Sequence, residues 1–127
     1  MSLLELLCPS RWVGYRGYCY KHEIREMEWE QALSVCLQQN ASLATIPDQN
    51  HVYFLERISQ GSRPWIGLHS RAIPTVFAWT DGSPFTQHNL IGFDDGQMDK
   101  NCFFAHLIFQ RDLCTSKRSY VCARQGW

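Results

Sequence analysis

Apolar residues recur with helical spacing in the first third of the chain. Trp29, Ala32, Leu33 and Cys36 fall at positions i, i+3, i+4 and i+7, which is one stripe of an amphipathic helix. This stripe predicts a helix over residues 26–39, with its cysteine facing the core. An aromatic-rich run around a glycine turn precedes the helix and predicts a β-hairpin.

A second helix is predicted a few residues later. Asp48 follows a proline and suits the N-cap of a helix that ends near Ser59. The inward stripe of this helix would be His51, Phe54, Leu55 and Ile58. The segment between the two helices, residues 41–46, is predicted to be a short strand or an extended linker.

Beyond residue 62 the helical period disappears, and apolar runs alternate with turn signals. The runs predict strands over residues 65–68, 77–79, 102–105, 107–109 and 120–122. Helices come first and strands follow, which predicts an α+β fold with antiparallel sheet. Residues 81–101 fit no element and are broken by glycine and proline, so we expect a functional loop there.

Composition narrows the class of function. The chain has 127 residues, 12 basic and 12 acidic, and a formal charge of zero, so we expect no nucleic-acid partner and no anionic membrane surface. The cysteines are Cys8, Cys19, Cys36, Cys102, Cys114 and Cys122. An even number without a C-x-x-C pair is typical of a disulfide framework in a protein outside the reducing cytosol.

Neither zinc binding nor catalysis is predicted. The five histidines are far apart in the sequence, and no serine lies in a nucleophile-elbow motif. Residues 1–7 are too short, and too interrupted by Glu5, for a signal peptide or a membrane span. We expect them to be a stalk remnant or an artificial extension, followed by one domain over 8–124 and a tail at 125–127. Any membrane anchor is then expected outside this chain.

The ordered set of motifs resembles the C-type lectin-like domain over residues 8 to about 124. The matching residues are Cys8-Pro9 with Trp12, Cys19-Tyr20, Trp29 with Ala32 and Cys36, Leu43-Ala44 with Ile46, Trp65-Ile66-Gly67-Leu68, Phe77 with Trp79 and Asp81-Gly82, Cys102, Cys114, and Tyr120-Val121-Cys122. The resemblance implies two helices flanking two small antiparallel sheets, and a long loop that carries ligand contacts. It also implies three disulfides, which pair Cys8 with Cys19, Cys36 with Cys122, and Cys102 with Cys114.

Sugar-binding members of that family hold Ca²⁺ through oxygen ligands, and this sequence departs from their pattern. The family's Glu-Pro-Asn or Gln-Pro-Asp triplet is absent from the long loop. Lys100 stands where the family has a glutamate, and Phe109, Gln110 and Arg111 stand where it has Trp-Asn-Asp. Cations repel Ca²⁺ and offer it no lone pair, so we expect no cofactor and no calcium at the usual site. An atypical calcium site would use Asp94, Asp95 and Asp99.

The long loop has the composition of a protein interface, with apolar side chains beside polar ones. The predicted ligand-binding residues are Phe85, Gln87, His88, Leu90, Ile91, Phe93, Gln97, Met98, Phe109 and Arg111. We expect two or three of the five apolar loop residues to be buried and the others to make contacts. Asn40 begins an Asn-x-Ser sequon, which predicts an N-glycan outside the cytosol or a helix C-cap.

The expected function is that of the natural killer cell receptor group of this family. The domain would be the ectodomain of a type II membrane protein and would bind a protein ligand, secreted or on another cell, without calcium. The resemblance also leaves a homodimer as an alternative to a monomer, because members of the group are often homodimers. Three alternatives also stay open: a carbohydrate-binding lectin with an atypical site, one module of a tandem endocytic receptor resembling the mannose receptor, and a secreted or viral decoy.

Overall fold

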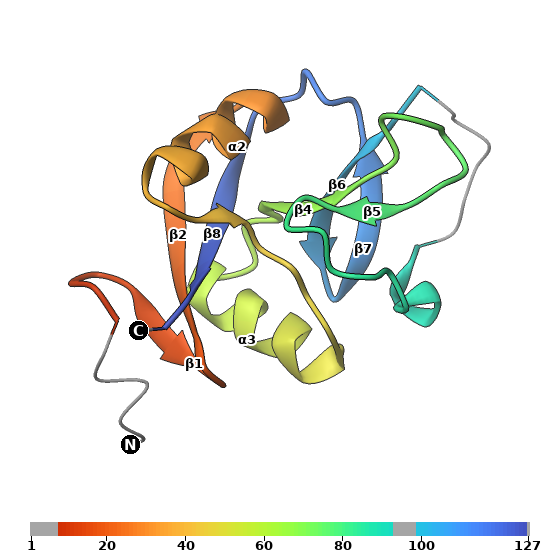
Figure 1. Cartoon of the computed structure of the whole chain (residues 1–127). Helices are drawn as coiled ribbons and strands as arrows, with labels where there is room; N and C mark the ends of the chain where they lie inside the picture. The colour runs from red at the N-terminus through yellow and green to blue at the C-terminus, as the bar shows by residue number, and fades with distance from the viewer. Residues whose placement is uncertain (1–7, 93–98, 127) are drawn as a thin grey trace.

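The computed structural model describes residues 8–92 and 99–126 of the chain (Figure 1). Its elements are β1 (Val13–Tyr15), β2 (Tyr18–Met27), α2 (Trp29–Gln38), β3 (Ser42–Leu43), α3 (Gln49–Ser59), β4 (Trp65–His69), β5 (Ala78–Trp79), the 3₁₀ helix η1 (His88–Leu90), β6 (Cys102–His106), β7 (Ile108–Asp112) and β8 (Arg118–Gln125). Within these ranges, no helix is both long and apolar enough to cross a lipid bilayer.

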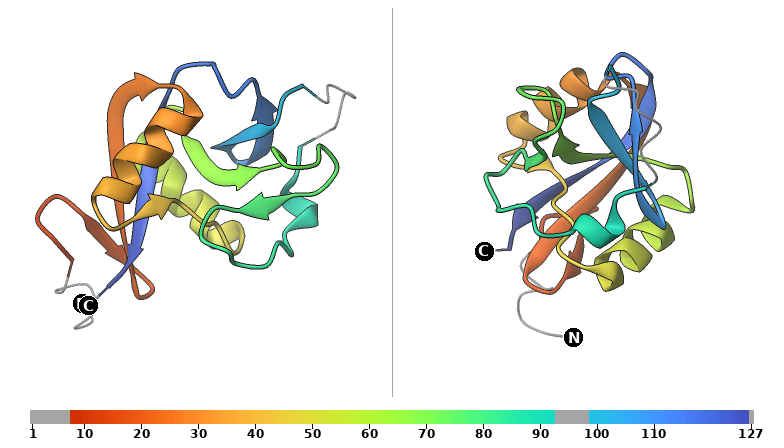
Figure 2. Two further views of the ribbon diagram at one scale, coloured as in Figure 1. Left: turned by 45° about the horizontal axis from the view of Figure 1, so that its top comes forward. Right: turned by 90° about the vertical axis from the view of Figure 1, so that its right-hand side faces the viewer.

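The strands form two antiparallel groups that are joined where β4 meets β8. One group contains β1, β2, β3 and β8, and the other contains β4, β5, β6 and β7. A single parallel pair, Trp65 opposite Tyr120, joins β4 to β8 and makes one continuous path in the order β1-β2-β8-β4-β6-β7. The two groups separate clearly in Figure 2, and the predicted α+β fold with two helices and antiparallel sheet is confirmed.

Both helices begin with local hydrogen bonds that the sequence encodes. The carboxylate of Asp48 accepts a bond of 3.0 Å from the backbone N–H of His51, which caps α3 as predicted. Helix α2 begins at Trp29 instead of residue 26, because β2 continues to Met27, which pairs with Arg118. The capping box of α2 therefore forms at Glu28, whose N–H donates to the side chain of Gln31.

The core consists of two clusters, one on each side of β4. The cluster under α3 includes Val52, Leu55 and Ile66, and the cluster under α2 is built around Trp29 and Trp65. Both indole N–H groups are bonded, from Trp29 to the carbonyl of Ile66 at 2.8 Å and from Trp65 to a backbone carbonyl of β2 at 3.0 Å. Burial of these rings therefore leaves no unpaired indole donor.

Three disulfides close the fold in the pairing that the resemblance implies. Cys8–Cys19 closes the segment that enters the first hairpin, and Cys102–Cys114 joins the start of β6 to the segment after β7. Cys36–Cys122 joins α2 to β8 across a sequence separation of 86 residues and lies entirely inside the core. Helix α2 and the C-terminal strand β8 are therefore linked covalently.

The loop predicted over residues 81–101 is partly structured. Helix η1 occupies residues 88–90, and Ile91 forms an isolated parallel bridge with Phe109 of β7. Leu90 is buried, which anchors the first half of the loop to the core around Trp79 and Phe109. The described part of the loop is thus held against the sheet.

Candidate functional site

Gln87 was predicted to contact ligand, but it is a buried structural residue. Its side-chain oxygen accepts bonds from the indole of Trp79 at 3.1 Å and from the N–H of Thr86 at 3.0 Å. Its side-chain nitrogen donates to the carbonyl of Pro47 at 3.3 Å. An amide satisfied in this way joins the long loop to the segment before α3 and is not available to a partner.

Two further predicted contact residues also face inward. Leu90 and Phe109 are buried in the cluster under α3, and the ring of Phe109 packs edge-to-face on Trp79 at 5.6 Å between centroids. The prediction is wrong for both residues, because composition alone does not separate a residue that holds a loop against the core from one that faces a partner. Phe85 and Ile91 are half-buried against the same cluster.

His88 is the exposed member of the predicted set in the described part of the loop, and its ring lies 4.6 Å from that of Phe85. The predicted contacts Phe93, Gln97 and Met98 lie outside the described residues, as do Asp94 and Asp95 of the alternative calcium site. Asp99 is described and exposed. In the described ranges, no three His, Cys, Asp or Glu side chains are grouped so as to hold a metal ion.

Arg111 lies at the centre of the surface beside the long loop. Its guanidinium donates to the carbonyl of Lys100 at 2.8 Å, to the hydroxyl of Ser70 at 2.9 Å and to the carbonyl of Pro74 at 3.1 Å. It also lies over the rings of Phe77 and Phe103, at 5.7 and 5.5 Å from their centroids. The cation therefore joins the end of β4, the β4–β5 loop and the return of the long loop.

The β4–β5 loop adds two exposed apolar side chains that the sequence reasoning missed. Ile73 is 54% exposed and Val76 is 55% exposed, on either side of the Pro74 carbonyl that Arg111 binds. Ile73 and Val76 belong to no family motif. The only sequence signal for an exposed apolar surface there is the presence of two aliphatic residues in a short stretch rich in polar and turn-forming residues. We call this surface the long-loop face: residues 71–76, His88, Asp99, Lys100 and Arg111.

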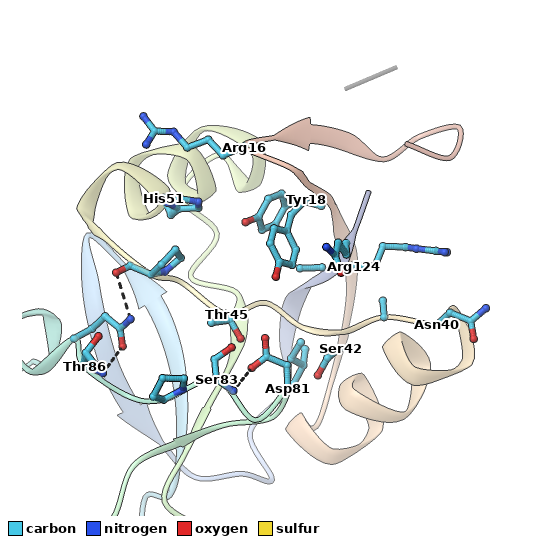
Figure 3. A pocket seen from close by; sticks show the side chains of 18 residues that line it. Arg16, Tyr18, Asn40, Ser42, Thr45, His51, Asp81, Ser83, Thr86 and Arg124 are labelled. Atoms are coloured by element: carbon cyan, nitrogen blue, oxygen red, sulfur yellow. Dashed lines mark hydrogen bonds between the residues drawn. The ribbon is translucent and has the colours of Figure 1, made fainter. Parts of the chain in front are cut away.

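A groove of about 770 Å³ lies elsewhere, between the first hairpin, the connection from α2 to α3 and the segment after β5. Figure 3 shows Tyr18 and Thr45 near its centre, with Asp81 on one side. Its lining is rich in hydroxyl and amide groups, and the buried Thr45 hydroxyl has no hydrogen-bond partner among the described residues. Asn40 lies at its edge.

Charged groups near the groove are already engaged. The Asp48 carboxylate lies 2.7 Å from the His51 ring nitrogen. Burial acts to raise the pKa of Asp48, but hydrogen bonds from His51 outweigh it and hold that pKa below its usual value. Arg124 donates to the carbonyl of Gln39 and so caps the end of α2. The groove thus combines the engaged side chains of Asp48 and Arg124 with neutral hydroxyl and amide groups.

Comparison with known proteins places the chain in a family. The family model described as "Lectin C-type domain" matches residues 25–124. Killer cell lectin-like receptor subfamily F member 1 of Macaca fascicularis is 31% identical over 120 residues, which cover 92% of this chain and 51% of that receptor. The galactose-specific lectin nattectin of Thalassophryne nattereri is 27% identical over 130 residues, covering 92% of this chain and 80% of nattectin. The chain spans about half the length of most of the curated relatives it matches first.

Solved structures agree on the fold. Human lithostathine superposes with a TM-score of 0.84 at 21% identity, covering 94% of this chain and all of the lithostathine chain. A calcium-independent type II antifreeze protein superposes with a TM-score of 0.83 at 20% identity, covering 94% of this chain and 95% of the other. The matched family model, the three disulfides and these superpositions lead to one conclusion: the chain belongs to the C-type lectin domain family, and its relatives include natural killer cell receptors.

Proposed function

We propose that this domain is the extracellular recognition domain of a cell-surface receptor, and that it binds a protein ligand through the long-loop face without calcium. A membrane anchor would lie in a segment outside this chain. The observation that carries the proposal is the position of Arg111, where sugar-binding members of the family have an acidic calcium ligand.

The side chain of Arg111 supports calcium independence in two ways. Its positive charge lies beside the Lys100 carbonyl, and Lys100 adds a second cation where the family has a glutamate. A cation at either position disfavours Ca²⁺ electrostatically. In addition, the oxygens of Lys100, Ser70 and Pro74 that face the guanidinium already have a donor.

The exposed apolar residues support a protein ligand. Ile73 and Val76 lie on a loop that Arg111 fixes from below, and both are more than half exposed. Protein interfaces typically combine such apolar anchors with a polar rim, which His88, Asp99 and Lys100 would supply here. A partner would bury the two aliphatic side chains at the centre of the contact.

The test is a binding screen of the dimerised domain against a library of cell-surface and secreted proteins, run with EDTA and repeated with calcium. We expect a protein ligand whose binding is equal in both buffers. Ile73→Asp and Val76→Asp should each weaken that binding at least tenfold, because each buries a charge at the contact.

Ile24→Asp is the matched control. Ile24 is 82% exposed and lies on β2, away from the long-loop face, so the same substitution there should leave binding unchanged. Equal losses for Ile24→Asp and Ile73→Asp would show that the effect is not local to the face. Wild-type affinity in both face variants would refute the proposed surface.

Calcium is tested separately by thermal melting. Ca²⁺ at a hundred times its dissociation constant would add about 2.7 kcal/mol of stability, whereas we expect no shift in millimolar calcium. A clear rise in melting temperature would contradict the calcium-free mechanism and would direct attention to Asp94, Asp95 and Asp99.

A carbohydrate-binding function is the second candidate. It is supported by the similarity to nattectin, whose name gives it galactose specificity, and by the hydroxyl- and amide-rich groove near Tyr18 and Thr45. A glycan array probed in EDTA and in calcium separates the candidates. Saccharide binding that survives Ile73→Asp and is lost in a Tyr18→Ala variant would favour the groove and this second function.

A further inference from the structure

Asn40 offers a modification site that is independent of the ligand surface. It begins the sequence Asn40-Ala41-Ser42, and proline, which blocks N-glycosylation at the middle position, is absent. Asn40 is exposed and follows Gln39, the C-cap residue of helix α2. We propose that Asn40 carries an N-linked oligosaccharide and that the transfer takes place before the C-terminal strand β8 has folded.

The end of α2 presents the asparagine to solvent. Asn40 has a φ of 57°, the left-handed conformation in which asparagine commonly ends helices, and its backbone N–H donates to the carbonyl of Leu37 at 3.1 Å. Figure 3 shows its side chain pointing away from the other residues of the groove. An oligosaccharide on this side chain extends into solvent and requires no movement of the core.

The rest of the sequon is engaged in the folded domain. Ala41 is buried, and the Ser42 hydroxyl lies 2.6 Å from the hydroxyl of Thr80. Ser42 and Leu43 also form strand β3, which pairs with β8 opposite Ala123. A transferase must bind the sequon as a free segment and must reach the hydroxyl at its third position, so the folded arrangement excludes it.

Chain order provides the time for the reaction. The strand that captures β3 comes about 80 residues after the sequon, and synthesis at roughly 5–20 residues per second leaves about 4–16 s before it appears. The Cys36–Cys122 disulfide, which fixes the end of α2, also waits for the last residues. During that interval β3 lacks its partner strand, although Thr80, whose hydroxyl bonds Ser42 in the final fold, lies only 38 residues after Ser42.

The position of the glycan is compatible with ligand binding on the long-loop face. The connection from α2 to β3 lies at the left of Figure 1, whereas the β4–β5 loop lies at the right. Asn40 borders the groove instead, beside Arg124, so a glycan there would stand next to the groove and leave Ile73 and Val76 uncovered.

The first experiment uses the chain secreted from cultured cells with an added sequon tag at its C-terminus. Intact mass before and after glycosidase treatment, followed by peptide mapping, locates the sugars. We expect a glycan at Asn40 that is lost in Asn40→Gln and retained in Ser42→Thr. Modification of the tag without any at Asn40 overturns the proposal, because the tag shows that the chain met the transferase.

The second experiment tests the order of events. Unglycosylated protein is folded in vitro and then incubated with purified oligosaccharyltransferase and lipid-linked oligosaccharide, beside a reduced and denatured sample. We expect at least a tenfold lower yield for the folded sample. Equal yields would refute the requirement for transfer before β8 folds, while the tag in the same molecules reports transferase activity.

Discussion

Removal of the Cys36–Cys122 disulfide should destabilise the domain more than removal of Cys8–Cys19. The perturbation is a pair of double variants, Cys36→Ala with Cys122→Ala and Cys8→Ala with Cys19→Ala, so that neither leaves a free thiol. The first bridge closes a sequence separation of 86 residues and the second closes one of 11. A longer loop restricts the unfolded chain more, and its loss therefore costs more stability.

The chain-entropy relation gives the size of the difference. It predicts a loss of about 4.6 kcal/mol for the long loop and about 2.8 kcal/mol for the short one at 25 °C. For 127 residues the entropy of unfolding converts these values into falls in melting temperature of roughly 17 °C and roughly 10 °C. Domains of this kind have total stabilities of about 5–15 kcal/mol, so the loss is nearly the whole stability at the lower end of that range and about a third of it at the upper end.

Thermal melting followed by circular dichroism measures both values, after mass spectrometry of alkylated, unreduced protein has shown that the other bridges are intact. A Cys36 and Cys122 double variant that melts within a few degrees of wild type would refute the reasoning. A Cys8 and Cys19 double variant that loses as much stability as the other would do so as well, because both bridges would then act locally.

Three further outcomes follow from particular contacts. Gly67→Ala should cost about 1–3 kcal/mol of stability by overpacking, because a Cβ there would lie 2.6 Å from the Leu43 carbonyl oxygen and 2.6 Å from the Thr80 hydroxyl oxygen. Urea denaturation measures the loss. Gly82→Ala is the comparison and should lose less stability, because a Cβ there meets nothing within 4 Å and only the positive φ is strained. Leu107→Gly should stabilise the domain by up to about 1 kcal/mol, because Leu107 is half exposed at a φ of 65°, and a lower denaturation midpoint would contradict this. Burial lowers the pKa of His22 and of His69 below the usual 6.5, and Arg71 adds to the effect at His69. The two imidazoles therefore bind protons at higher pH in the unfolded chain than in the folded one. The free energy of unfolding should accordingly be highest above pH 6.5 and fall as the pH drops below that value. Chemical denaturation at about pH 7.5 and about pH 5.5 checks this, and equal stability at the two values would exclude it.

Features controlled by neighbouring residues could be predicted from the sequence. Asp48 caps α3, and α3 ends at Ser59, because the capping bond and the left-handed residue after the helix are both local. The start of α2 is wrong in the sequence-based prediction, because β2 continues to Met27, which pairs with Arg118 of β8, far away in the chain. Val52 was missed because α3 buries a wider face than one narrow stripe.

The candidate site was less predictable, for a physical reason. Gln87, Leu90 and Phe109 have the residue types of a binding surface, yet all three are buried. Their side chains attach the long loop to the core, and Gln87 does so through a hydrogen bond from Trp79. Composition reports how many apolar residues a loop has, and only the packing decides which of them face inward. The exposed pair Ile73 and Val76 lies on a different loop, which becomes part of the same face only through the three-dimensional contacts of Arg111.

The contacts of Arg111 give the proposed surface a positive charge that is part of the chain itself. Three oxygen atoms, from Ser70, Pro74 and Lys100, converge on its guanidinium, and oxygen is the atom type that a hard cation would also take. A guanidinium satisfies such oxygens with directed N–H donors and needs no free ligand in solution. In the proposed function, the positive charge that binds the β4–β5 loop is therefore covalently part of the chain, so the loop would keep its shape at any calcium concentration and present Ile73 and Val76 ready for a partner.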